Sequence, residues 1–72
     1  MPCVSPDGKP TSSGLATLKS VSDGAFTPIE IGKATGQPMF RVKSGLRELV
    51  SAGFLEVFDD KYILTSDGKN VL

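Results

Sequence analysis

The fold is decided by a stretch that opens at Phe26 and reads FTPIEIGKATGQPMFRVKSGLRELVSAG through Gly53. The first residues of this stretch form the clearest local signal in the chain. Thr27 is a good helix N-cap, Pro28 suits the first helical position, and Glu30 completes a T-x-x-E capping box. The pattern therefore predicts a short helix that begins directly after Thr27.

A second, longer helix is predicted to follow after a tight turn. Gly36 stands where a helix commonly ends in a left-handed residue, and Pro38 suits the opening turn of a new helix. We expect that helix to run from about Met39 to Ala52, with one apolar face made of Met39, Val42, Leu46, Leu49 and Val50. Gly45 lies inside it, where a glycine costs about 1 kcal/mol relative to alanine. Close packing and simple tolerance explain this glycine equally well.

An amphipathic helix is also predicted before this pair. Ser12 or Ser13 can cap it. The apolar residues Leu15, Leu18 and Val21 recur every three positions, which predicts one narrow buried face.

A hairpin and a last helix are predicted after the pair. Residues 54–58 and 62–64 are rich in strand formers and flank the polar tip 59–61, a pattern typical of a β-hairpin. Residues 25–26 form a short extended segment that can add one or two ladder positions. Thr65 can cap a final short helix that runs through Val71 and Leu72.

The totals are those of one small domain. The chain has 72 residues, and a domain of this size buries only about 60% of the surface of its unfolded chain. Residues 1–11 hold three prolines and no apolar periodicity, so we expect a disordered or loosely docked tail before a folded domain at 12–72. Cys3 is then expected to be a free thiol on a mobile tail.

Several functional classes are disfavoured by composition. The chain has one cysteine and no histidine, so it lacks the residues of an ordinary zinc site, and no cofactor or metal is expected. No apolar run approaches the ~18 residues that span a membrane, and the first residues do not resemble a signal peptide. The sequence is therefore interpreted as that of a cytoplasmic protein.

The charges are separated along the chain although they sum to zero. Lys33, Arg41, Lys43 and Arg47 are four basic residues in a segment that has no acidic one. From Glu48 to Asp67 there are five acidic residues and a single basic one, Lys61. This distribution predicts a polarised surface.

Taken in order, these pieces resemble a winged helix-turn-helix domain of the kind found in prokaryotic transcription regulators such as the MarR and ArsR groups. The resemblance rests on the runs TPIEIGKATG (27–36), LVSAGFL (49–55) and YILTSDG (62–68), and on the apolar positions Val42 and Leu46. It implies an α+β fold with a three-helix core, a β-hairpin wing and a short C-terminal helix.

The resemblance also implies binding of double-stranded DNA, with residues 37–47 in the major groove. Base edges would be contacted by Gln37, Phe40, Arg41 and Ser44, and phosphates by Lys33, Lys43, Arg47 and, from the wing, Lys61. Such regulators often bind as homodimers or with a partner subunit. Phe40 either packs onto the preceding helix or makes contact with a ligand, and the basic face can also be an ordinary solvated surface.

The alternative function is a winged helix module that docks to protein without binding DNA. Zero net charge and the acidic wing tip, Asp59 and Asp60, favour it, because DNA-binding wings usually carry Arg or Lys there. An enzyme is the weakest hypothesis, since the chain has neither a histidine base nor a P-loop.

Overall fold

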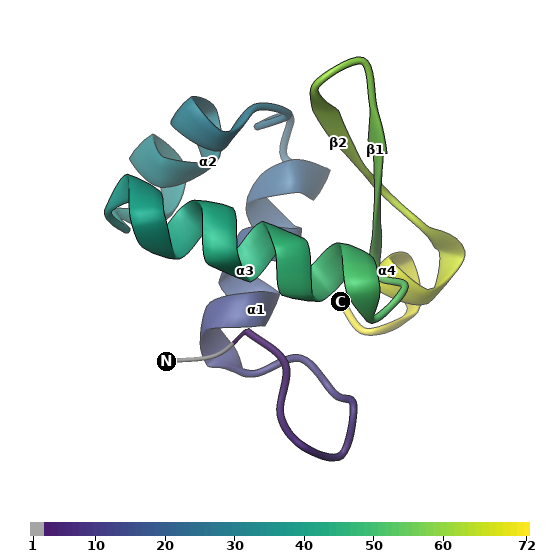
Figure 1. The fold of residues 1–72 in the computed structure, drawn as a ribbon. Helices are drawn as coiled ribbons and strands as arrows, with labels where there is room; N and C mark the ends of the chain where they lie inside the picture. The colour runs from purple at the N-terminus through teal and green to yellow at the C-terminus, as the bar shows by residue number, and fades with distance from the viewer. Residues whose placement is uncertain (1–2) are drawn as a thin grey trace.

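The computed structural model describes residues 3–72 and has the α+β architecture expected from the sequence, with three helices followed by a hairpin and a short helix. In chain order the elements are α1 (Ser12–Ser22), α2 (Pro28–Thr35), α3 (Met39–Ser51), β1 (Leu55–Phe58), β2 (Lys61–Leu64) and α4 (Ser66–Asn70). In Figure 1, α3 crosses in front of α1, the hairpin rises beside α3, and α4 lies below the hairpin.

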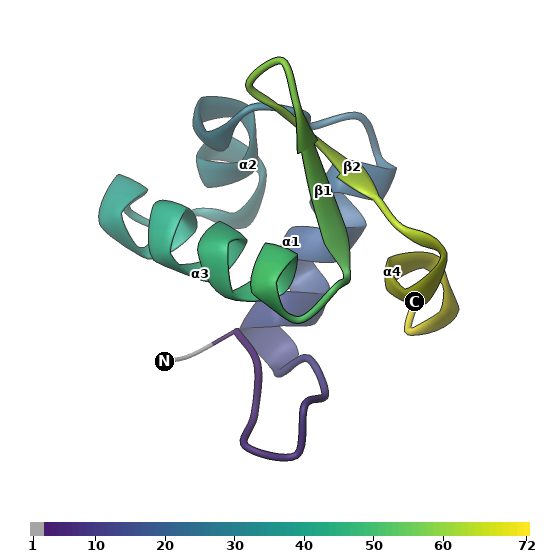
Figure 2. The same cartoon turned by 45° about the vertical axis from the view of Figure 1, so that its right-hand side comes forward.

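A small apolar core lies where α1, α2, α3 and β1 meet. Its fully buried side chains come from all four elements and include Leu18, Ile31, Val42, Leu46, Leu49 and Leu55. The turned view in Figure 2 shows the hairpin packing against the C-terminal half of α3. The apolar face predicted for α3 is confirmed at its centre, whereas Met39 at its start is exposed.

The buried face of α1 differs from the prediction. Leu18 and Val21 are buried, but Leu15 is 37% exposed, and Thr17 is buried in its place. The Thr17 hydroxyl donates to the Ser13 carbonyl at 3.0 Å, so the helix itself satisfies this polar group. The N-cap is Thr11, whose Oγ1 accepts from the Gly14 N–H, and not Ser12 or Ser13 as expected.

The segment before α1 is docked onto the core. Cys3 is a free thiol, as expected, but it is only 3% exposed, so the expectation that it lies on a mobile tail is wrong. The Cys3 carbonyl accepts from the Thr11 N–H at 2.9 Å, and Val4 forms a bridge with Pro10. Residues 3–11 therefore close a turn on themselves, which is the purple loop below α1 in Figure 1.

Two glycines make room for this segment. A methyl group at Gly45 of α3 would overlap the Cys3 Sγ, and one at Gly14 of α1 would overlap the Cys3 carbonyl oxygen. Of the two explanations for Gly45, close packing therefore applies. The segment that packs against this glycine is the N-terminal one and not another helix.

The hairpin has a two-residue turn. Its register pairs Leu55 with Leu64 and Val57 with Tyr62, so these side chains share the inner face. The turn residues Asp59 and Asp60 have φ values of 53° and 63°, as a type I′ turn requires at both central positions. The Tyr62 N–H donates a hydrogen bond of 2.9 Å to the Phe26 carbonyl. The short extended segment expected at residues 25–26 therefore lies along the outer edge of β2.

Candidate nucleic-acid interface

The α2–α3 corner is fixed by local chemistry that the sequence predicted. The Thr27 side chain accepts from the Glu30 N–H at 3.3 Å, and the Glu30 carboxylate accepts from the Thr27 N–H at 3.1 Å, so the capping box is confirmed. Gly36 ends α2 with a φ of 72°. Pro38 is the N-cap of α3, so the turn between the helices is short.

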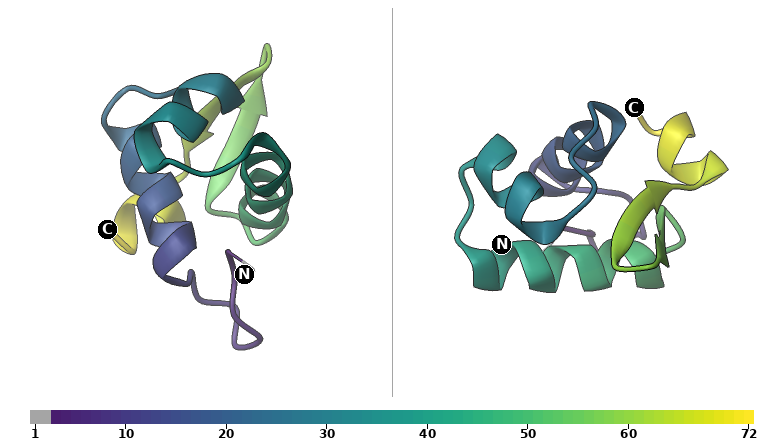
Figure 3. Two further views of the ribbon diagram at one scale, coloured as in Figure 1. Left: turned by 90° about the vertical axis from the view of Figure 1, so that its left-hand side faces the viewer. Right: turned by 90° about the horizontal axis from the view of Figure 1, so that it is seen from above.

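One long side of α3 faces away from the rest of the molecule. Figure 3 (right) shows α3 along one edge of the molecule, with the other helices all to the same side of it. The side chains that α3 exposes include five predicted DNA contacts, namely Phe40, Arg41, Lys43, Ser44 and Arg47. Phe40 is 72% exposed, so it does not pack into the core. Gln37, in the turn before α3, is half-buried.

The cations of this surface are not neutralised by carboxylates. Within residues 3–72, Lys33, Arg41, Lys43 and Arg47 form no ion pair. The acidic residue of α3, Glu48, is half-buried and accepts a long hydrogen bond of 3.4 Å from the Cys3 N–H. Its carboxylate is therefore directed toward the N-terminal segment, and the exposed side of α3 keeps a net positive charge.

The predicted wing contact, Lys61, is exposed at the start of β2, opposite Phe58 and next to the acidic turn. Hydrogen bonds from Thr27, with a smaller contribution from the nearby Lys61 ammonium, lower the pKa of Glu30. The charge of Lys61 is thus partly offset by Glu30.

Sequence reasoning missed a groove between α3 and the inner face of the hairpin. It has a volume of about 350 Å³ and is lined by Pro28, Lys43, Arg47, Val50, Val57 and Tyr62. Strand alternation could have indicated it, because Val57 and Tyr62 share the face of Leu55 but lie farther toward the tip.

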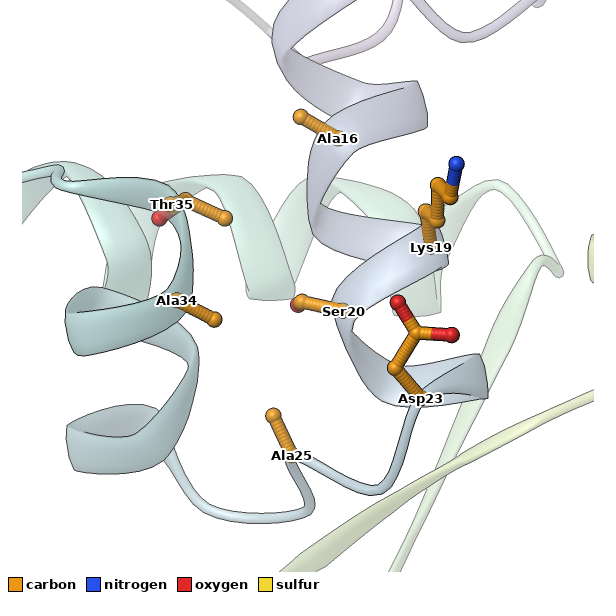
Figure 4. A pocket seen from close by; sticks show the side chains of 7 residues that line it. All are labelled: Ala16, Lys19, Ser20, Asp23, Ala25, Ala34 and Thr35. Atoms are coloured by element: carbon orange, nitrogen blue, oxygen red, sulfur yellow. The ribbon is translucent and has the colours of Figure 1, made fainter.

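A second hollow lies between α1 and α2 and carries no comparable chemistry. Small side chains line most of it, as Figure 4 shows, with Lys19 and Asp23 at one side. Its hydroxyls are already used by their own helices, since Ser20 donates to the Thr17 carbonyl and Thr35 to the Ile31 carbonyl. This hollow therefore does not compete with the α3 surface as a candidate site.

The buried thiol is not a reactive group in this fold. Burial first, and the Glu48 carboxylate second, raise the pKa of Cys3. The thiol therefore stays protonated at neutral pH, in the form that is not nucleophilic. In the described part of the chain, no cluster of Asp, Glu, Cys or His side chains could hold a metal ion.

Comparisons with protein families, curated proteins and solved structures find no match to this chain. Among residues 3–72, no helix is both long enough and apolar enough to cross a membrane.

Proposed function

We propose that this chain is a winged helix domain that binds double-stranded DNA through α3, as a module of prokaryotic transcription regulation. The carrying observation is the side of α3 that faces solvent, where Arg41, Lys43 and Arg47 are exposed and form no ion pair within residues 3–72. Unpaired cations on the exposed surface of a helix suit a polyanion, because each releases a counterion from the phosphate backbone when it binds.

The shape of the corner supports major-groove binding. α3 projects along one side of the molecule and begins at a short turn, so its first residues can approach base edges. Arg41 suits bidentate pairing with guanine, which discriminates by about 1–3 kcal/mol, and the exposed ring of Phe40 suits a thymine methyl. Lys43, Arg47 and, from α2, Lys33 suit phosphates.

The acidic hairpin tip limits the contact of the wing with DNA. Asp59 and Asp60 carry two negative charges at the turn, and Lys61 is partly offset by Glu30. We therefore assign phosphate binding to the helices and at most a minor part to the hairpin. With few cations, a single domain would bind weakly, near the micromolar non-specific range of about 10⁻⁶ M. A second copy or partner subunit would be needed for tight binding.

The test is a fluorescence anisotropy titration with a mixed-sequence duplex over a range of salt concentrations. The variant Arg41→Gln/Lys43→Gln/Arg47→Gln removes three charges from α3. The matched control is the variant Lys9→Gln/Lys19→Gln/Lys69→Gln. It removes the same net charge from cations outside α3. We expect the α3 variant to lose about two units of the salt slope, and the control to keep it.

The alternative remains a winged helix module that binds protein and not DNA. Zero net charge and the acidic tip favour it. The same titration, repeated with NMR detection of the amides, separates the two functions. Equal losses in both triple variants, or amide shifts in NMR that do not gather on residues 37–47, would leave only non-specific charge attraction and remove DNA as the ligand of α3.

A further inference from the structure

The groove between α3 and the hairpin combines an apolar floor with a cationic edge. Four of its lining residues, Pro28, Val50, Val57 and Tyr62, supply apolar or aromatic surface. The other two, Lys43 and Arg47, supply positive charge, and no acidic side chain lines it. An apolar centre with a charged rim that includes tyrosine and arginine is the composition of a protein-binding surface.

The floor of this groove is apolar surface that the core does not cover. Leu55 and Val57 lie on the same inner face of β1, and Leu55 is fully buried. Val57 lies nearer the hairpin tip and is 51% exposed. Its cross-strand neighbour Tyr62 is half-buried beside it. Covering this pair with an apolar side chain would remove both from water, which favours binding.

The edge of the groove selects a negatively charged ligand. Lys43 and Arg47 form no ion pair within the described residues. The nearest acidic residues in the sequence point elsewhere, since Glu48 accepts from the Cys3 N–H and Glu56 lies on the outer face of the hairpin beside Ile63. The positive charge at the groove therefore lacks a partner within the chain, and an arginine binds a carboxylate through two parallel hydrogen bonds.

We propose that this groove binds an acidic peptide segment of a protein partner. An apolar side chain of the segment lies between Val57 and Tyr62, and an adjacent carboxylate pairs with Arg47 and Lys43. This goes beyond the proposed DNA binding and does not depend on it, because the peptide is recognised in the absence of DNA.

The positive charge of the groove alone would also suit a nucleic acid. The apolar floor of the groove distinguishes a nucleic acid from an acidic peptide. A phosphate backbone can use the two cations but offers no aliphatic side chain to the pocket formed by Val57 and Tyr62. A peptide uses both parts of the groove. The volume of about 350 Å³ accommodates a bulky side chain with its neighbours.

The test is an NMR and calorimetric titration of the full chain, without DNA, at low salt. The probe is a blocked peptide of alternating Glu and Leu with a central Phe. A second peptide of equal charge has Ser in place of Leu and Phe. We expect the first to shift the amides of Val57 and Tyr62, and to bind about tenfold more tightly than the second.

Two variants of the hairpin localise the binding. Val57→Ser removes apolar surface from the groove, and Ile63→Ser removes a similarly exposed side chain, at 46%, from the opposite face. We expect Val57→Ser to weaken binding of the first peptide about fivefold and Ile63→Ser to change it less than about twofold. Circular dichroism checks that both variants are folded.

Other outcomes overturn the proposal. Equal binding of the two peptides would mean that the cations attract any anion. Equal effects of Val57→Ser and Ile63→Ser would move the binding surface away from the groove. Unchanged binding in Lys43→Gln/Arg47→Gln, with the matched variant Lys19→Gln/Lys69→Gln as control, would remove the carboxylate contact.

Discussion

Replacing Gly45 by alanine should destabilise this protein, although the same change inside an ordinary helix is stabilising. A Cβ added at Gly45 would overlap the Cys3 Sγ, but it would lie 3.6 Å from the Cys3 Cβ, an ordinary contact distance. The sulfur atom alone therefore stands in the way. The prediction tests the docking of the N-terminal segment, for which the sequence left a disordered and a loosely docked tail open.

The magnitude follows from two opposing contributions. Alanine gains about 1 kcal/mol over glycine in helix propensity. Forcing an additional methyl group into packed space typically costs about 1–3 kcal/mol. Gly45→Ala should therefore lower the free energy of unfolding by up to about 2 kcal/mol in the wild-type chain. In a Cys3→Ala chain the methyl group fits, and the same substitution should raise that free energy by up to about 1 kcal/mol.

The assay is urea unfolding of the four proteins of this double-mutant cycle under reducing conditions. We expect a coupling free energy of at least about 1 kcal/mol between the two positions. Gly14→Ala is the control, because its Cβ would overlap the Cys3 carbonyl oxygen, which Cys3→Ala leaves in place. It should destabilise both backgrounds. If Gly45→Ala stabilises the wild-type chain as much as the Cys3→Ala chain, Cys3 is not packed against α3.

Four further variants, one of them compared across pH, test other parts of the structure. Thr27→Ala removes the capping-box hydroxyl and should cost about 1 kcal/mol in urea unfolding. Hydrogen bonds lower the pKa of Glu30 in the folded state, so its carboxylate should stabilise the fold above about pH 4.3, the ordinary pKa of a glutamate. This contribution should be lost as the pH falls through the lowered pKa. In acid unfolding, Glu30→Gln should reduce this dependence on pH. Replacing Asp59 and Asp60 by Asn and Gly keeps a turn suited to positive φ and should raise the melting temperature and the affinity for duplex DNA. Phe40→Ala should change stability by less than about 0.5 kcal/mol yet weaken DNA binding in anisotropy measurements.

The parts of the fold that the sequence predicted are those set by neighbouring residues. The capping box needs only Thr27 and Glu30, which are three positions apart, and the stop after α2 needs only Gly36. The hairpin follows from alternation over a few residues, although the tip predicted at 59–61 is a turn of two residues, and Lys61 already belongs to β2. In each case the stabilising contact is made within a short segment, so the pattern alone is enough to indicate it.

The parts that could not be predicted depend on contacts between distant segments. Residues 3–11 have no apolar periodicity, and Cys3 is buried because Gly14 and Gly45, far along the chain, leave space for it. The same packing makes Thr17 a buried residue of α1 and leaves Leu15 exposed. No periodic pattern in the sequence indicates that these residues are buried or exposed. The space that Cys3 fills forms only when α1 and α3 pack together.

The α3 surface and the groove share two residues, so the two proposed ligands compete for the same side chains. Lys43 and Arg47 belong both to the proposed DNA contact and to the edge of the groove. A carboxylate and a phosphate cannot occupy the same guanidinium and ammonium groups, so the two proposed ligands exclude each other. Arg41 and Phe40 do not line the groove, and Val57 does not lie on α3. Substitutions at these three positions therefore separate the two activities, because each should affect one ligand and leave the other.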